Sequence, residues 1–213
     1  SFEVQDTHFD LKLFGKFNVY NSLAAISLAL SQGLDLTVCK KALEEVEGLP
    51  GRMEFINEGQ DFKVLVDYAP EPESLNQMYR TIQDHGMKKG KIIHVLGSCG
   101  GGRDISRRPV LGGIAAKNAD VVIIANEDPY DDDPMEIINQ VAQGAIQAGK
   151  TEGESLLKVL DRREAIQKAL NLAKKDDLVI LTGKGSEQAI CVAKGKKIIW
   201  DERQVARKIL KTL

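Results

Sequence analysis

The sequence lacks several features that would point to particular partners. Its 213 residues carry 29 basic and 31 acidic side chains, and the net charge of −2 offers no cationic field for nucleic acid or an anionic membrane. It shows no secretory signal peptide and no apolar run of the roughly 18 residues that a membrane span needs. We therefore expect a cytoplasmic protein without nucleic-acid or membrane partners.

Cysteine and histidine are scarce as well. Cys39, Cys99 and Cys191 are odd in number and lack C-x-x-C spacing, which argues against a disulfide framework or a zinc site and favours a reducing compartment. His94 lies inside the apolar run KIIHVLG, where a hydrogen-bonded core histidine is a better interpretation than a catalytic one. The sequence predicts no metal site.

A true phosphate-binding loop is also missing, although one stretch imitates it. GAIQAGKT, residues 144–151, matches G-x-x-x-x-G-K-[ST], but a helical pattern that begins at Asp133 and Pro134 leads into it. Gly149 is therefore expected to end that helix, and a strand pattern follows, so no helix N-terminus would receive a phosphate. Lys150 is interpreted as a solvated charge that complements a helix C-terminus.

The chain does contain a regular alternation of strand and helix patterns. Unbroken apolar runs are typical of strands that helices cover on both faces, which predicts an α/β fold with a doubly wound, mostly parallel sheet. Helices are expected from Glu73, Arg107, Pro134, Asp161 and Asp201, the last two with capping boxes to Glu164 and Gln204. The expected strands are KVLVDYA, KIIHVLG, DVVIIAN, LLKVL, DLVILTG and KKIIW, with a short helical stretch before the last.

A domain boundary is predicted near residue 50. Before it come a strand-like alternation in FDLKLFG, a helix over Asn18–Leu30 and a second helix from Asp35 or Thr37. The segment GLPGR, residues 48–52, then breaks the helical pattern. We expect a helical fragment at 1–50, cut from something longer, and an α/β domain at 51–213.

The segments that follow the strands are rich in acids, arginines and glycines. They read DYAPEPESL, GSCGGGRDISRRP, NEDPYDDDP and TGKGSEQ. In doubly wound sheets, ligands bind at the carboxyl ends of the strands, so these segments are the expected site. GSCGGG lacks the G-x-G-x-x-G spacing, which disfavours a nicotinamide-dependent oxidoreductase.

Together with GKFNVYNSLAAISLAL and GLPGRME upstream, these segments resemble the Mur ligases, in particular the UDP-N-acetylmuramoyl-tripeptide ligase branch of peptidoglycan synthesis. Residues 1–50 resemble the tail of the family's central ATPase domain, and 51–213 resemble its Rossmann-like C-terminal domain, which binds the amino acid. The resemblance implies ATP-dependent amide formation, in which ATP phosphorylates a carboxylate and an amine attacks the acyl phosphate.

The resemblance also implies cofactors and partners. ATP and Mg²⁺ are the implied cofactors, with the magnesium ligands expected mainly outside this chain. The implied partners are a UDP-N-acetylmuramoyl-peptide, a free diamino acid, and the N-terminal and central domains of the same protein. No catalytic residue is assigned within these 213 residues, and the chain alone is expected to be inactive.

Three residues match nucleotide-facing positions of the family. Asn21 would contact the adenine, although a helix N-terminal cap is an equally open interpretation. Arg52 would face the ATP phosphates or be a solvated linker charge, and Asp67 would hold the ribose hydroxyls. The family's D-Y-A-H-T-P is changed here, because Pro70 and Glu71 replace the histidine and threonine.

Other residues match the family's amino-acid site. Arg103 would grip a carboxylate of the incoming amino acid, and Glu187 would accept from its side-chain ammonium, with Gly183 lending a backbone group. Gly102 replaces the first Asp of the family's G-G-D-R-D. Lys184 and Arg108 are left open between a ligand role and a surface ion pair or helix-start charge.

The loop NEDPYDDDP suggests which diamino acid is used. Where the diaminopimelate-adding branch reads D-N-P-R, this chain has Glu127, Asp128, Pro129 and Tyr130, so the arginine that clamps a distal carboxylate is absent. The two acids would suit an ammonium, which favours lysine or ornithine. Alternatively both acids cap the helix that begins at Pro134, and the acids at 131–133 are a solvated helix-starting run.

Two functional classes remain open on this sequence. The retained Asp67, Arg103 and Glu187 favour an enzyme, and all three are predicted to lie in one cleft. The changes at Pro70 and Gly102 favour a non-catalytic ligand-binding or interaction domain that kept the fold.

Overall fold

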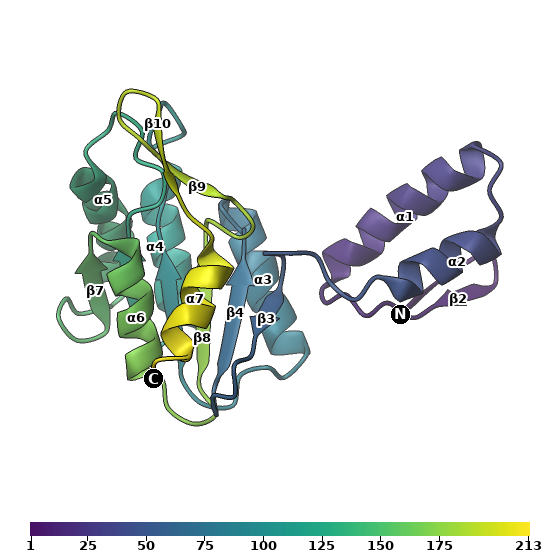
Figure 1. Cartoon of the computed structure of the whole chain (residues 1–213), viewed down its shortest axis with the longest axis horizontal. Helices are drawn as coiled ribbons and strands as arrows, with labels where there is room; N and C mark the ends of the chain where they lie inside the picture. The colour runs from purple at the N-terminus through teal and green to yellow at the C-terminus, as the bar shows by residue number, and fades with distance from the viewer. The chain divides into compact units, whose positions relative to one another are not determined.

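The computed structural model describes all residues, 1–213, and the chain divides into two compact units, Ser1–Leu49 and Pro50–Leu213. The division falls inside the GLPGR segment, where two glycines and a proline interrupt the helical pattern. The smaller unit consists of a hairpin and two helices, and the larger one is an α/β layered structure (Figure 1).

The smaller unit begins with a short hairpin that the sequence pattern placed too late. Gln5 and Asp6 form its turn with positive φ angles of 46° and 62°. The second strand ends at Phe9, which pairs with the first residue of the first strand, Phe2, and does not continue through FDLKLFG. Phe9 packs with Ile26 and Cys39 in a small core. The unit contains β1 (Phe2–Val4), β2 (Thr7–Phe9), α1 (Lys16–Ser31) and α2 (Leu36–Glu45).

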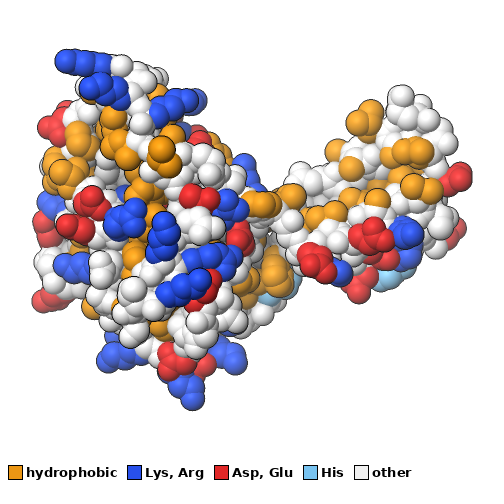
Figure 2. All heavy atoms as spheres, viewed as in Figure 1, with side chains coloured by type: hydrophobic (Ala, Val, Ile, Leu, Met, Phe, Trp, Pro, Cys, Tyr) orange, Lys and Arg blue, Asp and Glu red, His pale blue; other side chains and the backbone are white.

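Helix α1 exposes apolar side chains. Tyr20 is 62% exposed and Leu28 is 67% exposed, and no charged residue occurs between Lys16 and Asp35. Figure 2 shows hydrophobic side chains along the visible face of this unit. A helix that is apolar on most of its faces is usually buried, so this surface calls for a covering element. None of the helices combines the length and the low polarity needed to cross a lipid bilayer.

The larger unit is built on one six-stranded sheet. Its strand order is β3-β4-β8-β5-β6-β7, and all neighbours are parallel except the edge strand β3, which runs antiparallel to β4. The predicted doubly wound, mostly parallel sheet is confirmed. The strands are β3 (Glu54–Ile56), β4 (Lys63–Asp67), β5 (Ile92–Leu96), β6 (Val121–Ala125), β7 (Leu156–Val159) and β8 (Leu178–Thr182).

Helices cover both faces of this sheet. Figure 1 shows α6 and α7 in front of it and α3, α4 and α5 behind it. Alternate residues of one strand face opposite helix layers, so Val64 and Val66 join the core under α6 and α7. The helices are α3 (Pro72–Asp84), α4 (Arg107–Asn118), α5 (Pro134–Gln147), α6 (Arg162–Leu172) and α7 (Glu202–Leu210).

Residues 186–199 differ from the sequence expectation. The short helical stretch predicted before KKIIW is instead β9 (Ala189–Val192), which pairs antiparallel with β10 (Lys196–Ile199) in a separate hairpin. Lys194 and Gly195 turn the hairpin with positive φ angles of 61° and 66°. KKIIW is therefore a strand, as predicted, but it lies outside the main sheet.

The predicted helix starts are largely confirmed. Asp161 accepts a hydrogen bond from the Glu164 amide at 3.0 Å, and Asp201 accepts one from the Gln204 amide at 3.2 Å. The return bonds of the two predicted capping boxes do not form, and Arg203 donates to Asp201 instead. Asp133 caps α5 through the Met135 amide at 2.8 Å, so one of the three acids at 131–133 starts a helix as expected.

The GAIQAGKT segment is a helix end. Helix α5 stops at Gln147, Gly149 has a φ of 96°, and a turn then leads to β7, so no helix follows the motif. Lys150 Nζ donates to the carbonyls of Ala119 and Asp120 at 2.6 and 2.9 Å, directly after the end of α4. The lysine therefore complements the C-terminus of α4, and not that of its own helix.

His94 is a hydrogen-bonded core residue, as the sequence indicated. It is fully buried on β5, with Nδ1 2.6 Å from the Tyr79 hydroxyl and Nε2 2.9 Å from Thr182 Oγ1. Burial, together with the nearby Arg162 guanidinium, lowers the pKa of His94 from 6.5 to about 3. The folded protein therefore keeps this imidazole neutral at any mildly acidic pH.

This burial predicts a loss of stability in mild acid. Between pH 6.5 and pH 3 only the unfolded chain protonates His94, so the folded state loses relative stability as the pH falls. From pH 6.5 to 5.0, one such proton lowers the free energy of unfolding by about 2 kcal/mol. Urea unfolding of the wild type and His94→Gln at pH 7 and pH 5 measures this: the wild type should lose about 2 kcal/mol more than the variant. Equal losses would contradict the assignment.

Candidate functional site

Four loops meet at the carboxyl edge of the sheet. They follow β4, β5, β6 and β8 and span residues 68–71, 97–106, 126–133 and 183–188; we call them the carboxyl-edge loops. Because β8 lies between β4 and β5 in a parallel arrangement, these strand ends share one edge. Backbone bonds join the loops, from Gly183 N to Tyr68 O at 2.9 Å and from Gly100 N to Asp128 O at 2.8 Å.

Lys184 lies at the centre of this edge. Its Nζ donates to Asp128 Oδ1 and Oδ2 at 2.9 and 2.8 Å and lies 2.7 Å from Glu187 Oε2. The lysine is 0% exposed, so it is ion-paired but not at the surface, which corrects the surface-pair interpretation. Burial lowers the pKa of Lys184, but the two carboxylates outweigh burial and leave the pKa above its ordinary value.

Asp128 and Glu127 are less accessible than a ligand contact requires. Asp128 is 5% exposed, and besides Lys184 its Oδ1 accepts from the Cys191 amide at 2.7 Å. Glu127 is 3% exposed and accepts from Cys99 Sγ at 3.1 Å. Burial raises the pKa of Glu127, partly offset by Arg162. Neither acid caps α5, so that alternative is wrong, and the geometry argues against direct contact of a ligand with Asp128.

Gly183 leaves space for the carboxylate of Glu127. A Cβ there would lie 2.1 Å from Glu127 Oε2, and its φ is 104°, so both space and backbone conformation require glycine. Its N–H already donates to the Tyr68 carbonyl. The backbone group that Gly183 can still offer to a ligand is its carbonyl oxygen.

Glu187 is the exposed acid beside Lys184. Its side chain is 40% exposed, and while Oε2 is held by Lys184, Oε1 has only the distant Tyr68 hydroxyl at 3.4 Å. The exposed Arg52 stacks over the Tyr68 ring at 4.4 Å from the centroid. Arg52 and Glu187 therefore flank the same tyrosine from opposite sequence ends of the larger unit.

Asp67 ends β4 as a buried residue. It is 8% exposed, and its two oxygens accept from the amides of Met53 and Ala69 at 2.7 and 2.9 Å. Burial raises the pKa of Asp67, opposed by these amides and by Arg52. The carboxylate thus stabilises the turn at Met53, whose φ is 47°. This structural role exists whether or not Asp67 also binds a nucleotide.

Arg103 is the free cation of these loops. It is exposed, and its guanidinium makes no hydrogen bond or ion pair. The loop that carries it turns through Gly101 and Gly102 with φ angles of 62° and 78°. A Cβ on Gly101 would lie 2.7 Å from the Tyr130 ring, so the Arg103 loop and the 126–133 loop are in contact.

Two arginines at the start of α4 are buried, in contrast to the sequence prediction. Arg108 is 3% exposed and donates to Cys99 O at 3.0 Å, Gln140 Oε1 at 2.7 Å and Asp132 Oδ2 at 3.2 Å, so it is not a surface charge. Arg107 is buried as well and pairs with Glu71. The run SRRP gave no sign of this, because arginines at a helix start are usually solvated.

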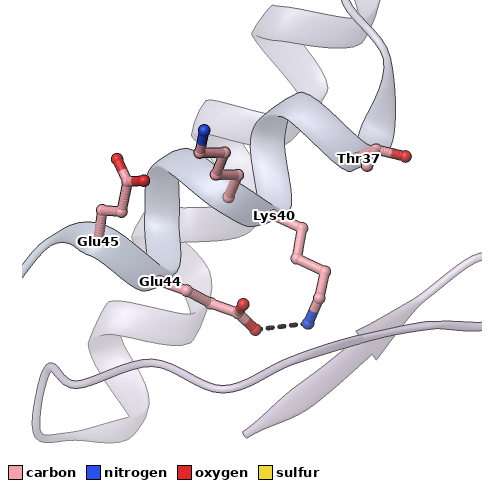
Figure 3. A pocket seen from close by; sticks show the side chains of 5 residues that line it. Thr37, Lys40, Glu44 and Glu45 are labelled. Carbon is pink, nitrogen blue, oxygen red and sulfur yellow. Dashed lines mark hydrogen bonds and ion pairs between the residues drawn. The ribbon is translucent and has the colours of Figure 1, made fainter.

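Asn21 and a hollow on α2 belong to the smaller unit. Asn21 lies inside α1, exposed, with Nδ2 3.1 Å from Asn18 Oδ1; Gly15 precedes the helix, so the capping interpretation of Asn21 is wrong. On α2 a shallow hollow is lined by Thr37, two lysines and two glutamates, with Lys40 paired to Glu44 (Figure 3). No group of three or more His, Cys, Asp or Glu side chains could hold a metal ion.

The family description "Mur ligase, glutamate ligase domain" matches residues 51–185. The chain belongs to the Mur ligase family. It is 43% identical over 95% of its length to a UDP-N-acetylmuramoyl-L-alanyl-D-glutamate–2,6-diaminopimelate ligase of Syntrophomonas wolfei. It is also 44% identical over 94% of its length to a UDP-N-acetylmuramyl-tripeptide synthetase of Treponema denticola. The chain spans 40% and 37% of these two Mur ligases, about two fifths of their length.

Solved structures give the same grouping. A UDP-N-acetylmuramoyl-L-alanyl-D-glutamate–2,6-diaminopimelate ligase superimposes with a TM-score of 0.68 at 30% identity, covering 96% of this chain and 40% of that one. A folylpolyglutamate synthase of Mycobacterium tuberculosis, with ADP and AMPPCP, shares the fold with a TM-score of 0.62 at 20% identity, covering 81% of this chain and 38% of that one. The Mur ligase fold predicted from the strand-end segments is thus confirmed.

Proposed function

We propose that this chain is the C-terminal part of an ATP-dependent ligase that joins a diamino acid to a UDP-N-acetylmuramoyl-dipeptide in peptidoglycan synthesis. The observation that carries the proposal is identity above 40% over about 95% of the chain to relatives named for tripeptide formation. In this reaction ATP phosphorylates the dipeptide carboxylate and releases ADP. The amine of the amino acid then attacks the acyl phosphate and displaces inorganic phosphate.

The carboxyl-edge loops would hold the incoming amino acid. Arg103, exposed and unpaired, offers the two parallel N–H groups that bind a carboxylate bidentately. Glu187 offers Oε1 to an ammonium group, and Gly183 offers its carbonyl. Tyr130 lies against Gly101 in the Arg103 loop, whereas Asp128 and Glu127 are buried and would act through the protein groups that they hold, Lys184 and Cys99. These groups bind and orient the nucleophile but transfer no phosphoryl group.

The nucleotide side is represented by fewer groups. ATP, bound with Mg²⁺, would supply the phosphoryl group. Arg52 fits an interaction with its phosphates because the guanidinium is exposed. Asn21 is exposed and would contact the adenine. Asp67 is 8% exposed with a backbone amide on each oxygen, so it would reach the ribose hydroxyls only through its remaining lone pairs. No group of acids in this chain is arranged to hold a metal ion, so we place the magnesium ligands mainly in other parts of the protein. Those parts would also cover the uncharged surface of α1. The reaction places the protein in the cytoplasm.

This proposal predicts a difference between the chain and the longer protein. The 213-residue chain should show no ATP turnover, because its one phosphate-loop match is the end of α5 and phosphoryl transfer needs a phosphate cradle and a metal site. The full-length protein should release ADP when given the muramoyl-dipeptide and a diamino acid. Coupled ADP assays measure both. Turnover by the chain alone would contradict the proposal that phosphoryl transfer needs other parts of the protein.

A failure of the full-length protein would favour the second functional class. Glu71, which replaces the family's threonine, is committed to the ion pair with Arg107, and Gly102 lacks the family's carboxylate. An intact, folded full-length protein that binds a diamino acid but releases no ADP would identify a non-catalytic binding domain.

A further inference from the structure

The ammonium of Lys184 is completely used by two acids from different loops. An ammonium has three N–H donors; two reach the oxygens of Asp128 and the third faces Glu187 Oε2. Lys184 is 0% exposed, so no water completes or competes for these bonds. The lysine therefore cannot contact a substrate without giving up one of these carboxylate oxygens.

The charges of this cluster do not cancel. Lys184 contributes one positive charge, and Asp128 and Glu187 contribute one negative charge each, which leaves the cluster one negative charge in excess. With a neutral asparagine at position 128, the lysine would neutralise Glu187 alone. Aspartate at this position thus makes the edge more anionic without itself being reachable from solvent.

The excess charge is accessible at one place only. Asp128 is fixed by Lys184 and by the Cys191 amide of β9, and it is 5% exposed, whereas the side chain of Glu187 is 40% exposed. Oε2 of Glu187 is held, and Oε1 is left with a long contact to the Tyr68 hydroxyl. A cation from solution would meet the negative charge at Oε1.

We propose that Lys184 is a positioning residue, and Asp128 a specificity-determining one, that act through Glu187: Asp128 takes up the charge of Lys184, so Glu187 keeps its own charge for the distal ammonium of the substrate. The inference rests on the proposed ligase function. It selects a side chain that ends in a bare ammonium over one that carries a second carboxylate beside it. In this arrangement Asp128 does not touch the ligand, in contrast to the sequence prediction, but acts on it through Lys184 and Glu187.

The test is Asp128→Asn in the full-length ligase. Asparagine keeps the size and shape of aspartate and removes only its charge, so folding should survive. We expect kcat/KM for lysine to fall roughly tenfold or more, because a charge-assisted bond to Glu187 weakens. The loss should arise in KM for lysine, with kcat and KM for ATP within about twofold. The ratio of kcat/KM for lysine to that for meso-diaminopimelate should fall with it.

The matched control is Asp131→Asn. This exposed acid lies in the same loop and accepts one backbone bond, from Lys194 N at 2.8 Å, but does not contact Lys184. It should leave the lysine-to-diaminopimelate ratio unchanged. A ratio that is unchanged in Asp128→Asn, or changed equally in the control, overturns the inference. If Asp128→Asn does not fold, Lys184→Arg keeps the charge but loses the shared geometry, and an unaltered KM for lysine overturns it.

The two proposals fail in different ways. If the wild-type ligase shows no turnover with any diamino acid, the proposed function fails, and NMR of the Lys184 Nζ group in the 213-residue chain still tests the inference. There the pKa of Lys184 should fall in Asp128→Asn, because that carboxylate helps to raise it. An unchanged pKa would show that Asp128 does not take up the lysine charge.

Discussion

Replacing Arg162 with methionine should lower the free energy of unfolding by about 3–5 kcal/mol. Arg162 is 2% exposed and Glu202 is 0% exposed, and the guanidinium donates to both carboxylate oxygens at 3.0 and 2.6 Å. Methionine fills much of the volume but leaves the Glu202 charge buried with only the Trp200 indole N–H, at 2.8 Å, to compensate it. The cost is therefore that of an uncompensated buried carboxylate and not that of a lost surface ion pair.

Urea unfolding of three variants would measure this cost. In Arg162→Met/Glu202→Leu the buried charge is removed as well, so a large part of the stability should return. Lys88→Met breaks the exposed pair with Asp120, whose side chains are 47% and 40% exposed, and should cost less than about 1 kcal/mol. A loss in Arg162→Met as small as that of the Lys88 control would show that the buried pair is not critical.

Arg162 also connects the core to the candidate site. Its Nη2 donates to the carbonyl of Thr182 at 2.6 Å and its Nη1 to that of Asn126 at 3.2 Å. Thr182 and Asn126 directly precede Gly183 and Glu127, at the ends of β8 and β6. One buried side chain thus fixes the relative position of two carboxyl-edge loops, so the variant should lose binding of the amino acid together with stability.

The main sheet could be predicted from sequence because its central strands are long apolar runs. β8 is buried at every residue, and such a run between helical patterns has few other interpretations. The short strands were harder. β3 and β9 have three and four residues, and their pairing depends on partners that no local pattern identifies. The hairpin of β9 and β10 was read as partly helical for this reason.

The meeting of the four carboxyl-edge loops was more predictable than the partners within them. The rule for parallel sheets identified the four loops, because it depends only on strand direction. The burial of Lys184 was not predictable, since its partner Asp128 lies 56 positions away in sequence. Asp128 was read as a ligand group because an acid after a strand looks the same whether its cation comes from the substrate or from the protein. The residue type of Asp128 therefore does not show whether its carboxylate binds a substrate cation or a lysine of the protein.

We expect the full-length ligase to show a higher kcat/KM for lysine or ornithine than for meso-diaminopimelate. Tyr130 occupies the place of the arginine that would clamp a distal carboxylate. A hydrogen bond with the Cys191 side chain raises the pKa of its phenol, which stays uncharged. Its backbone N–H donates to the Cys191 carbonyl at 3.1 Å and its ring lies against Gly101, so its position in the loop is fixed from two sides.

A neutral phenol cannot replace a bidentate cationic pair, and losing one charged hydrogen bond of this kind costs about 1.5–3 kcal/mol. That cost corresponds to roughly 10- to 150-fold in affinity for diaminopimelate. Overall identity does not indicate which amino acid is used, because the chain is 43% identical to the Syntrophomonas wolfei relative named for diaminopimelate and 44% identical to the Treponema denticola relative named only for tripeptide formation.

Competition assays with lysine and meso-diaminopimelate would decide which amino acid is preferred. Tyr130→Arg should raise kcat/KM for diaminopimelate, while Tyr130→Met, which adds no cation, should not. A wild-type preference for diaminopimelate would show that another cation, with Arg103 as the first to examine, binds the distal carboxylate.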